Sequence, residues 1–301
     1  GDAAHLERIV RFARDDVVSE RPLLLACAPR GALYEALGAV TVGVEPRWEL
    51  DLSRAPGGGD GGLRPFQEER DLPELLRLHA IDGAGRSASL VRTAEVWPWL
   101  RRRPQEIWIE EHGYLGVREH EGALEVAEVA GDEPSFHARA LCEAARIARG
   151  RRLTRLFGAI PPDHPFAVAT IPRGPTARID YPARHGLMGY ILDVERFFGA
   201  LRPALDRRLG ARGERVAVEL AIDTSDGGAA AVQLGPPGVP RRRIELRLAR
   251  GPLLQLAFGF ADVRSLLAAH PPAAVMLEED VDLLDHLFPV GFPFMWHGDR
   301  W

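Results

Sequence analysis

The feature that most constrains this 301-residue chain is a compact pattern near its start. An apolar run at 23–27 has the length of a strand and ends at the turn signal Pro-Arg-Gly of 29–31. A short helix is predicted over 33–37, and Gly38 follows it where a left-handed C-terminal residue is needed. The β-branched residues of 40–44 predict a second strand. The sequence therefore predicts a strand, a tight loop, a short helix and another strand in close succession.

Tyr34 lies inside this short helix. A phenol has a pKa of about 10, so it stays protonated at neutral pH and can give its proton to a departing thiolate. A packing role is the alternative, because a tyrosine on a short amphipathic helix is commonly half-buried with its hydroxyl in water. The pattern itself leaves both roles open.

Composition excludes several kinds of chemistry. All 38 basic residues are arginine, and the chain contains no lysine and no asparagine. Schiff-base lysines, P-loop lysines, Ser-Lys dyads and N-glycosylation are therefore excluded. With 46% apolar and 27% charged residues, the chain is typical of soluble globular proteins with two or three domains. A net charge of −5 argues against a general affinity for nucleic acid and favours attraction of cationic amines.

The cysteine, histidine and hydropathy patterns bear on the cellular compartment and on metal binding. Cys27 falls in a predicted strand and Cys142 in a predicted helix, as expected for free thiols in a reducing cytosol rather than for a disulfide. The sequence contains no apolar run of transmembrane length and no visible signal peptide, so we expect a cytoplasmic protein without membrane contact. The ten histidines lack metal-ligand spacing, so we expect no metal site.

A glycine-rich run at 56–62 divides the chain. It matches Gly-x-Gly-x-x-Gly literally, but a dinucleotide-binding fingerprint must follow a strand and begin a helix, and this run does neither. We interpret it as a linker.

The region after the linker is predicted to hold two helices, a three-stranded meander, a long helix and a further strand. The meander strands are expected at 107–109, 114–117 and 124–129, the long helix over 140–148 and the last strand at 156–160. The final third begins with a strand at 188–193 and a helix at 194–209. Three strands, at 216–222, 230–234 and 244–248, and two helices, at 262–269 and 280–287, follow.

This order resembles a known family. The pattern around Tyr34 resembles the second half of a GNAT N-acetyltransferase core, and the region after the linker resembles a second, degenerate GNAT copy. The final third resembles a sterol-carrier-protein-like (SCP2-like) domain. Together with Leu33-Tyr34 followed by Leu37-Gly38, and with an aromatic tail ending at Trp301, the order is similar to the Eis (enhanced intracellular survival) group of bacterial N-acetyltransferases.

The resemblance implies a mixed α/β and α+β fold. Its parts would be the C-terminal half of a first GNAT domain at 1–55, a linker at 56–62, a degenerate GNAT-like domain at 63–187 and an SCP2-like domain at 188–301. A helix is predicted over 2–13 from its apolar spacing, and no strand precedes it, which suggests an N-terminally truncated chain that is inactive alone. The apolar sheet edge left by the missing strands would favour a homo-oligomer.

The resemblance also implies a reaction. Acetyl-CoA would be the co-substrate and a small amine, such as an aminoglycoside, a polyamine or a lysine-like compound, the acceptor. Tyr34 would protonate the departing thiolate, and the terminal carboxylate of Trp301 would assist removal of the amine proton. The alternative for the tail is that Trp296 and Trp301 only dock it on apolar surface. The backbone of Cys27 and Ala28 would contact the cofactor. One departure is Arg300, whose charge would repel an amine.

The second copy departs from a cofactor-binding domain. Asp132 and Glu133 follow its strand at 124–129, where a pyrophosphate site would offer bare backbone N–H groups. We therefore expect this copy not to bind coenzyme A. A non-catalytic lipid- or ligand-binding protein that uses the SCP2-like domain is the alternative function.

Overall fold

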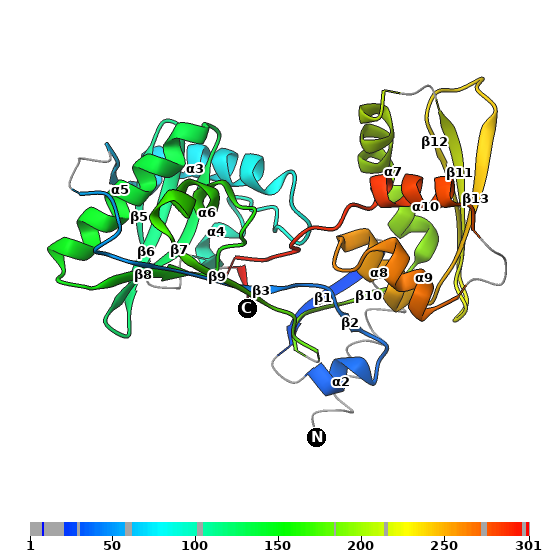
Figure 1. Ribbon diagram of the computed structural model, residues 1–301, viewed down its shortest axis with the longest axis horizontal. Coiled ribbons are helices and arrows are strands. Elements are labelled where there is room, and N and C mark those ends of the chain that lie inside the picture. The colour runs from blue at the N-terminus through cyan, green and yellow to red at the C-terminus, as the bar shows by residue number, and fades with distance from the viewer. Residues whose placement is uncertain are drawn as a thin grey trace. The chain divides into compact units, whose positions relative to one another are not determined.

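The computed structural model describes residues 8, 21–28, 31–57, 62–100, 105–183, 185–213, 216–271, 276–296, 299 and 300 (Figure 1). The chain forms two compact units. Unit 1 comprises Gly1–Gly43 and Pro182–Gly291, and unit 2 comprises Val44–Tyr181 and Phe292–Trp301. Most of the predicted linker, residues 58–61, lies outside the described residues.

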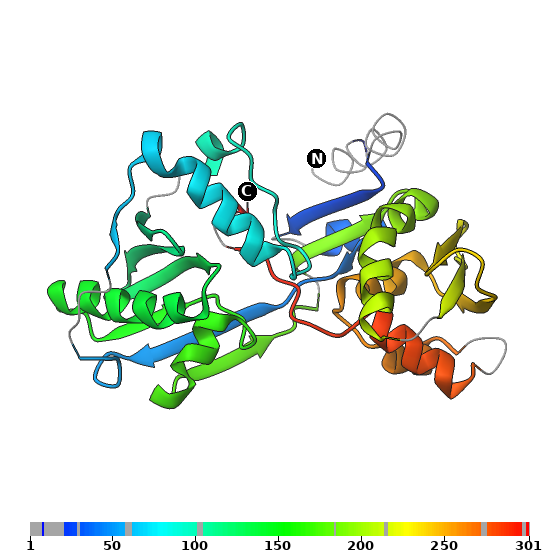
Figure 2. The same ribbon diagram turned by 90° about the horizontal axis from the view of Figure 1, so that it is seen from above.

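Unit 2 is built on a sheet whose seven described strands have the order β4-β5-β6-β7-β8-β3-β9. The strands are β3 (Glu45–Asp51), β4 (Arg64–Pro65), β5 (Glu106–Glu110), β6 (Gly113–His120), β7 (Ala123–Gly131), β8 (Arg155–Gly158) and β9 (Thr176–Asp180). Helices α3 (Glu68–Gly83) and α5 (Pro134–Gly150) lie on opposite faces of this sheet, as Figure 2 shows. The unit also contains α4 (Trp97–Leu100), α6 (Pro165–Thr170) and the 3-10 helix η2 (Ile171–Arg173).

Period-two alternation gives this sheet an apolar side chain on each face. Leu115 belongs to the core that contains the α5 residues, whereas its neighbour Tyr114 belongs to the smaller core that contains the α3 residues. The strands β7 and β8 are parallel, and they pair only at Leu124 with Leu156 and at Glu125 with Phe157. Beyond these pairs, β7 has no partner on β8 in the described part of the sheet.

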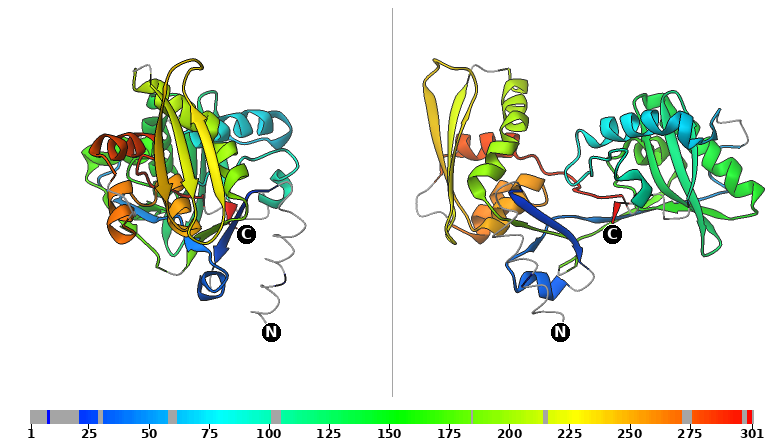
Figure 3. Two further views of the ribbon diagram at one scale, coloured as in Figure 1. Left: turned by 90° about the vertical axis from the view of Figure 1, so that its right-hand side faces the viewer. Right: turned by 180° about the vertical axis from the view of Figure 1, so that it is seen from behind.

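Unit 1 contains two three-stranded sheets in its described part. The first has the order β1-β10-β2, with β1 (Leu23–Ala28), β10 (Gly186–Ile191) and β2 (Val40–Thr41). The second has the order β12-β11-β13, with β11 (Ala217–Asp223), β12 (Ala229–Leu234) and β13 (Arg241–Arg247). The helices are α2 (Gly31–Glu35), α7 (Val194–Ala211), α8 (Arg250–Phe258), α9 (Val263–Ala269) and α10 (Glu278–Leu287). Figure 3 shows α7 along one face of the second sheet, where it contacts β12.

Two strands pair outside the segments to which the sequence assigned them. β3 belongs by sequence to the segment 1–55, but it lies between β8 and β9 in unit 2. All but the first two residues of β10 belong by sequence to the segment 188–301. The strand nevertheless pairs with β1 and β2, which come from the segment 1–55. Each of these two sheets thus takes one strand from a distant part of the chain. Local sequence predicts a strand but not its partner, which explains the difference.

The mixed α/β class is confirmed. The meander, the long helix α5, the helix α7 and the strands β11 to β13 lie where the sequence predicts them. The elements α6, α8 and β9 were not predicted. None of the described helices is both long enough and apolar enough to cross a bilayer.

Candidate functional site

The position of Tyr34 is fixed by the way its short helix ends. Gly38 has a φ of 85°, in the left-handed region, as the sequence predicts. Its N–H donates to the Glu35 carbonyl at 2.8 Å, and the N–H of Ala39 donates to the Tyr34 carbonyl at 3.0 Å. These two bonds form a Schellman motif, which satisfies the last carbonyls of α2 and turns the chain directly into β2.

The ring of Tyr34 packs on a small cluster between β1, β2 and β10. The cluster consists of Ala28, Ala39 and Met188, with Tyr190 beside them. A Cβ added at Gly38 would lie only 3.1 Å from the Tyr190 ring, so a glycine is also needed there for space. Tyr34 is half-buried, and its hydroxyl has no hydrogen bond within the described residues. The ring is therefore held while the hydroxyl stays available to a ligand.

Tyr190 is itself immobilised by Arg250 at the start of α8. The Arg250 guanidinium lies 5.9 Å from the centre of the Tyr190 ring, within the range of a cation–π contact. It also donates to the carbonyls of Ile191 and Leu192, at 3.2 Å each. A chain of contacts thus runs from α8 through β10 to Tyr34.

The predicted cofactor contacts Cys27 and Ala28 lie at the end of β1. They pair with Leu187 and Gly186 of β10. β1 is the last strand of its sheet in the described structure, so its other backbone edge carries no strand. An extended, amide-containing ligand can add to a sheet edge through its backbone groups. Trp301, the remaining predicted site residue, lies outside the described residues.

The N-terminus of α5 in unit 2 is surrounded by carboxylates. Asp132 accepts a hydrogen bond from Arg77 at 2.7 Å and contacts Nδ1 of His112 at 3.2 Å. Hydrogen bonds from Arg77, and secondarily from His112, lower the pKa of Asp132. Glu133 is the residue before the helix, and Arg139 contacts it at 3.4 Å. Both carboxylates are thus paired with cationic or histidine side chains, and the expectation that this copy does not bind coenzyme A stays a prediction.

Unit 2 contains a buried ionic cluster that the sequence did not reveal. The carboxylate of Glu128 on β7 accepts hydrogen bonds from both Nη atoms of Arg92, at 2.7 and 2.9 Å, and from the hydroxyl of Tyr114. Nδ1 of His79 lies 3.1 Å from the same carboxylate, and Nε2 of His79 bonds the Leu90 carbonyl at 2.9 Å. We call Arg92, Glu128, His79 and Tyr114, together with the Asp299 described next, the buried ionic cluster.

Asp299 joins the cluster from the end of the chain. Nε of Arg92 donates to its Oδ1 at 2.8 Å, and both side chains are almost fully buried. Burial and the neighbouring Glu128 raise the pKa of Asp299, against the opposing effect of Arg92. Burial alone would also raise the pKa of Glu128, but Arg92 and His79 lower it to about 2. Two buried carboxylates thus share one guanidinium.

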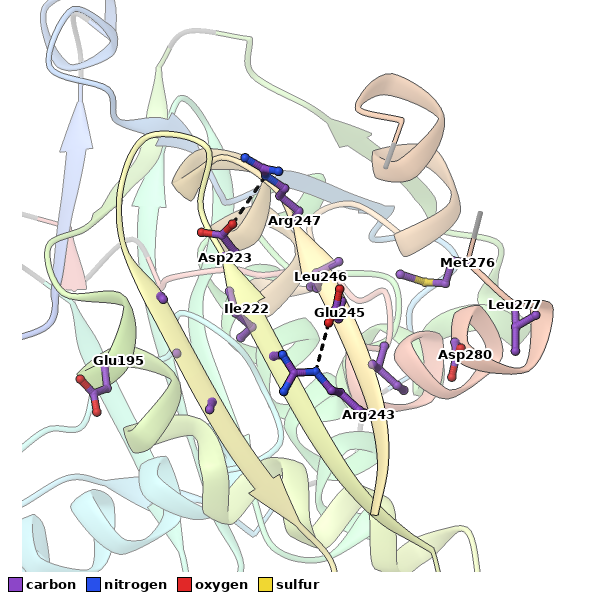
Figure 4. Close-up of a pocket in the computed structure, with 15 residues that line it drawn as sticks. Glu195, Ile222, Asp223, Arg243, Glu245, Leu246, Arg247, Met276, Leu277 and Asp280 are labelled. Carbon is purple, nitrogen blue, oxygen red and sulfur yellow. Dashed lines mark hydrogen bonds and ion pairs between the residues drawn. The ribbon is translucent and has the colours of Figure 1, made fainter. Parts of the chain in front are cut away.

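A hollow of about 770 Å³ lies along the second sheet of unit 1 (Figure 4). Its lining includes the charged residues Arg243, Glu245, Asp223 and Arg247. Arg243 pairs with Glu245 at 3.1 Å, and Arg247 with Asp223 at 3.6 Å. Nine of its fifteen lining residues are apolar, including Ile222, Leu246 and Met276. Since ligand pockets are lined mainly by apolar side chains, the alternative of a lipid- or ligand-binding protein stays a prediction. The described residues contain no group of three or more side chains that could hold a metal ion.

No protein-family model and no curated protein sequence matches the chain. Solved structures do. A GCN5-related N-acetyltransferase from Kribbella flavida is 17% identical with a TM-score of 0.68, over 98% of this chain and 76% of that chain. One from Anabaena variabilis is 15% identical with a TM-score of 0.69, over 100% and 78%. Eis1 from Mycobacterium abscessus is 15% identical with a TM-score of 0.62, over 100% and 78%. The chain therefore shares the fold of GCN5-related N-acetyltransferases.

Proposed function

We propose that the protein is an N-acetyltransferase that moves an acetyl group from acetyl-CoA to a small amine, with its acyl-transfer site at β1 and α2. The observation that carries the proposal is the placement of Tyr34, which the Schellman turn and the packing on Ala28 and Met188 hold at the end of β1. The likeness to GCN5-related N-acetyltransferase structures supports it at the level of fold. The negative net charge favours a cationic acceptor, such as a polyamine or an aminoglycoside.

The proposed step is aminolysis of a thioester. The amine nitrogen forms a bond to the acetyl carbon, and the carbon–sulfur bond breaks. The Tyr34 hydroxyl gives its proton to the departing thiolate, and the nitrogen loses one proton. In a protein that ends at Trp301, the terminal carboxylate accepts that proton through a water molecule, because a group with a pKa near about 3.5 is a weak direct base. Binding an extended pantetheine along β1 would use the backbone of Cys27 and Ala28.

A thiol-release assay on the intact protein tests this function. Acetyl-CoA is mixed with a polyamine, an aminoglycoside or free lysine, and free thiol is followed over time. We expect thiol release that depends on the amine. A thioester that stays intact with every amine, or that is lost equally fast without amine, contradicts the proposal.

The same assay examines Trp301. A Gly-Ser-Gly extension moves the terminal carboxylate away, so turnover should fall at least about tenfold, as for loss of a proton acceptor. The matched control Trp301→Phe keeps an aromatic terminus and its carboxylate and should stay near the wild-type rate. Equal rates in the extended and unextended proteins would remove Trp301 from the mechanism without affecting the proposal for Tyr34.

A further inference from the structure

The described part of 292–300, which we call the tail segment, is bound by unit 2. The N–H of Val44 donates to the Pro293 carbonyl at 2.9 Å, and the N–H of Phe294 donates to the Ser87 carbonyl at 3.2 Å. Val44 precedes β3, and Ser87 follows α3. Two distant parts of the unit therefore hold the backbone of the tail segment.

Two aromatic rings of the tail segment are inserted into the core of unit 2. Phe294 and Trp296 are 2% and 4% exposed, and they belong to the same core as Trp48 and Phe166. Their ring centres lie 4.9 Å apart in an edge-to-face arrangement, and Trp296 makes a similar contact with His164 at 5.5 Å. Aromatic pairs of this geometry stabilise a docked segment beyond simple burial.

Asp299 adds a directional contact to these apolar ones. The N–H of Asp299 donates to the Trp296 carbonyl at 2.9 Å, so a turn brings its carboxylate to Arg92. Both Nη atoms of Arg92 donate to Glu128, and the remaining donor, Nε, donates to Asp299 of the tail segment. His79 and Tyr114 hold Glu128 in turn. The donor that meets Asp299 is therefore pre-oriented before the tail segment binds, which reduces the entropic cost of docking.

We propose that residues 44–181 of unit 2 function as a docking module for the chain's own tail segment, recognising two aromatic rings and one carboxylate, namely Phe294, Trp296 and Asp299. The core of these residues and the Arg92 donor are occupied by the tail segment. This assignment goes beyond the transferase proposal and does not depend on it, because it requires neither cofactor nor turnover.

Hydrogen exchange of the full chain, followed by mass spectrometry on a peptide that covers 292–300, tests the assignment. Asp299→Ala removes the acceptor but leaves the pair of Arg92 with Glu128 intact. We expect the tail amides to exchange about tenfold faster or more, since a hydrogen bond to a charged group is lost and local opening becomes easier. Asp299→Asn keeps an oxygen that can accept from Nε and should stay within about threefold of wild type.

Two further variants complete the experiment. Arg151→Gln removes a charge of unit 2 that pairs with Glu106 at 2.6 Å and not with the tail segment, so it should leave the exchange of 292–300 unchanged. Asp299→Ser, whose shorter side chain does not reach Arg92, should match Asp299→Ala and replaces it if that variant unfolds. The assignment is overturned if the alanine and serine variants exchange at the wild-type rate, or if Arg151→Gln accelerates exchange as much as they do.

Discussion

Replacing Tyr34 by phenylalanine should lower kcat of the transferase by about 10²–10³ while substrate affinity stays nearly constant. Loss of one general acid typically produces a loss of this size, and removal of an interaction made only in the transition state changes kcat and not binding. The ring contacts with Ala28, Met188 and Tyr190 need no hydroxyl, so α2 should keep its structure. Steady-state kinetics with acetyl-CoA and the best amine from the thiol-release assay provide the measurement.

Tyr190→Phe is the matched control for this variant. Tyr190 lies beside Tyr34 in the same cluster, and its ring contacts with Gly38 and Arg250 survive loss of the hydroxyl. Its rate should remain near that of the wild type. Near-normal kcat in Tyr34→Phe would assign Tyr34 to packing and move the proton donor elsewhere, whereas equal losses in both variants would indicate a general disturbance of the cluster.

Replacing Arg92 by alanine should destabilise unit 2 by about 3–5 kcal/mol. Breaking a buried ion pair leaves an uncompensated buried charge, and here two carboxylates, Glu128 and Asp299, would lose their shared cation. All six tryptophans of the chain lie in unit 2, at positions 48, 97, 99, 108, 296 and 301. Urea unfolding followed by tryptophan fluorescence therefore reports on this unit.

Arg155→Ala supplies the comparison, since Arg155 pairs with Glu49 at 3.2 Å with both side chains about half exposed. An exposed pair of this kind contributes at most about 1 kcal/mol. Similar unfolding free energies for the Arg92 and Arg155 variants would mean that the buried ionic cluster is not electrostatically important.

The pH dependence follows from Glu128. Its pKa in the folded protein is about 2, below the ordinary value of 4.5, because Arg92 and His79 outweigh the effect of burial. Its contribution to stability is therefore fully present above about pH 4.5 and is lost as the pH falls towards 2. The difference in unfolding free energy between the wild type and Glu128→Gln should shrink over this range. A difference that stays constant from pH 5 to about pH 2 would contradict the assigned charge state.

Features encoded in short stretches of sequence could be predicted. Gly38 was expected to be left-handed because a glycine after a short helix is the usual C-terminal residue, and its φ of 85° confirms this. The meander strands were predictable because each is a short run rich in apolar residues, and turn signals lie between the runs. The helix α8 was missed because Gly251 and Pro252 suggest a loop, whereas in the structure they occupy its first turn.

Features that join distant residues could not be predicted. Arg92 and Asp299 are 207 positions apart, and nothing in either local sequence indicates the other. Glu128 gives a partial signal, since a carboxylate in a mainly apolar strand requires a partner, but Glu125 of the same strand gives the same signal. The exchange of β3 and β10 between the two sheets has the same origin, because strand pairing depends on the whole fold.

Alkylation of the two cysteines tests the central claim most directly. Cys27 lies on β1 beside the proposed acyl-transfer site, Cys142 lies on α5 of the copy expected not to bind cofactor, and both are partly exposed. The intact protein is treated with iodoacetamide with and without saturating acetyl-CoA, and each cysteine is quantified by mass spectrometry. Cofactor bound along β1 should slow modification of Cys27 several-fold and leave Cys142 unchanged. Protection of Cys142 alone, or of neither cysteine, would contradict an acetyl-CoA site at β1 and α2.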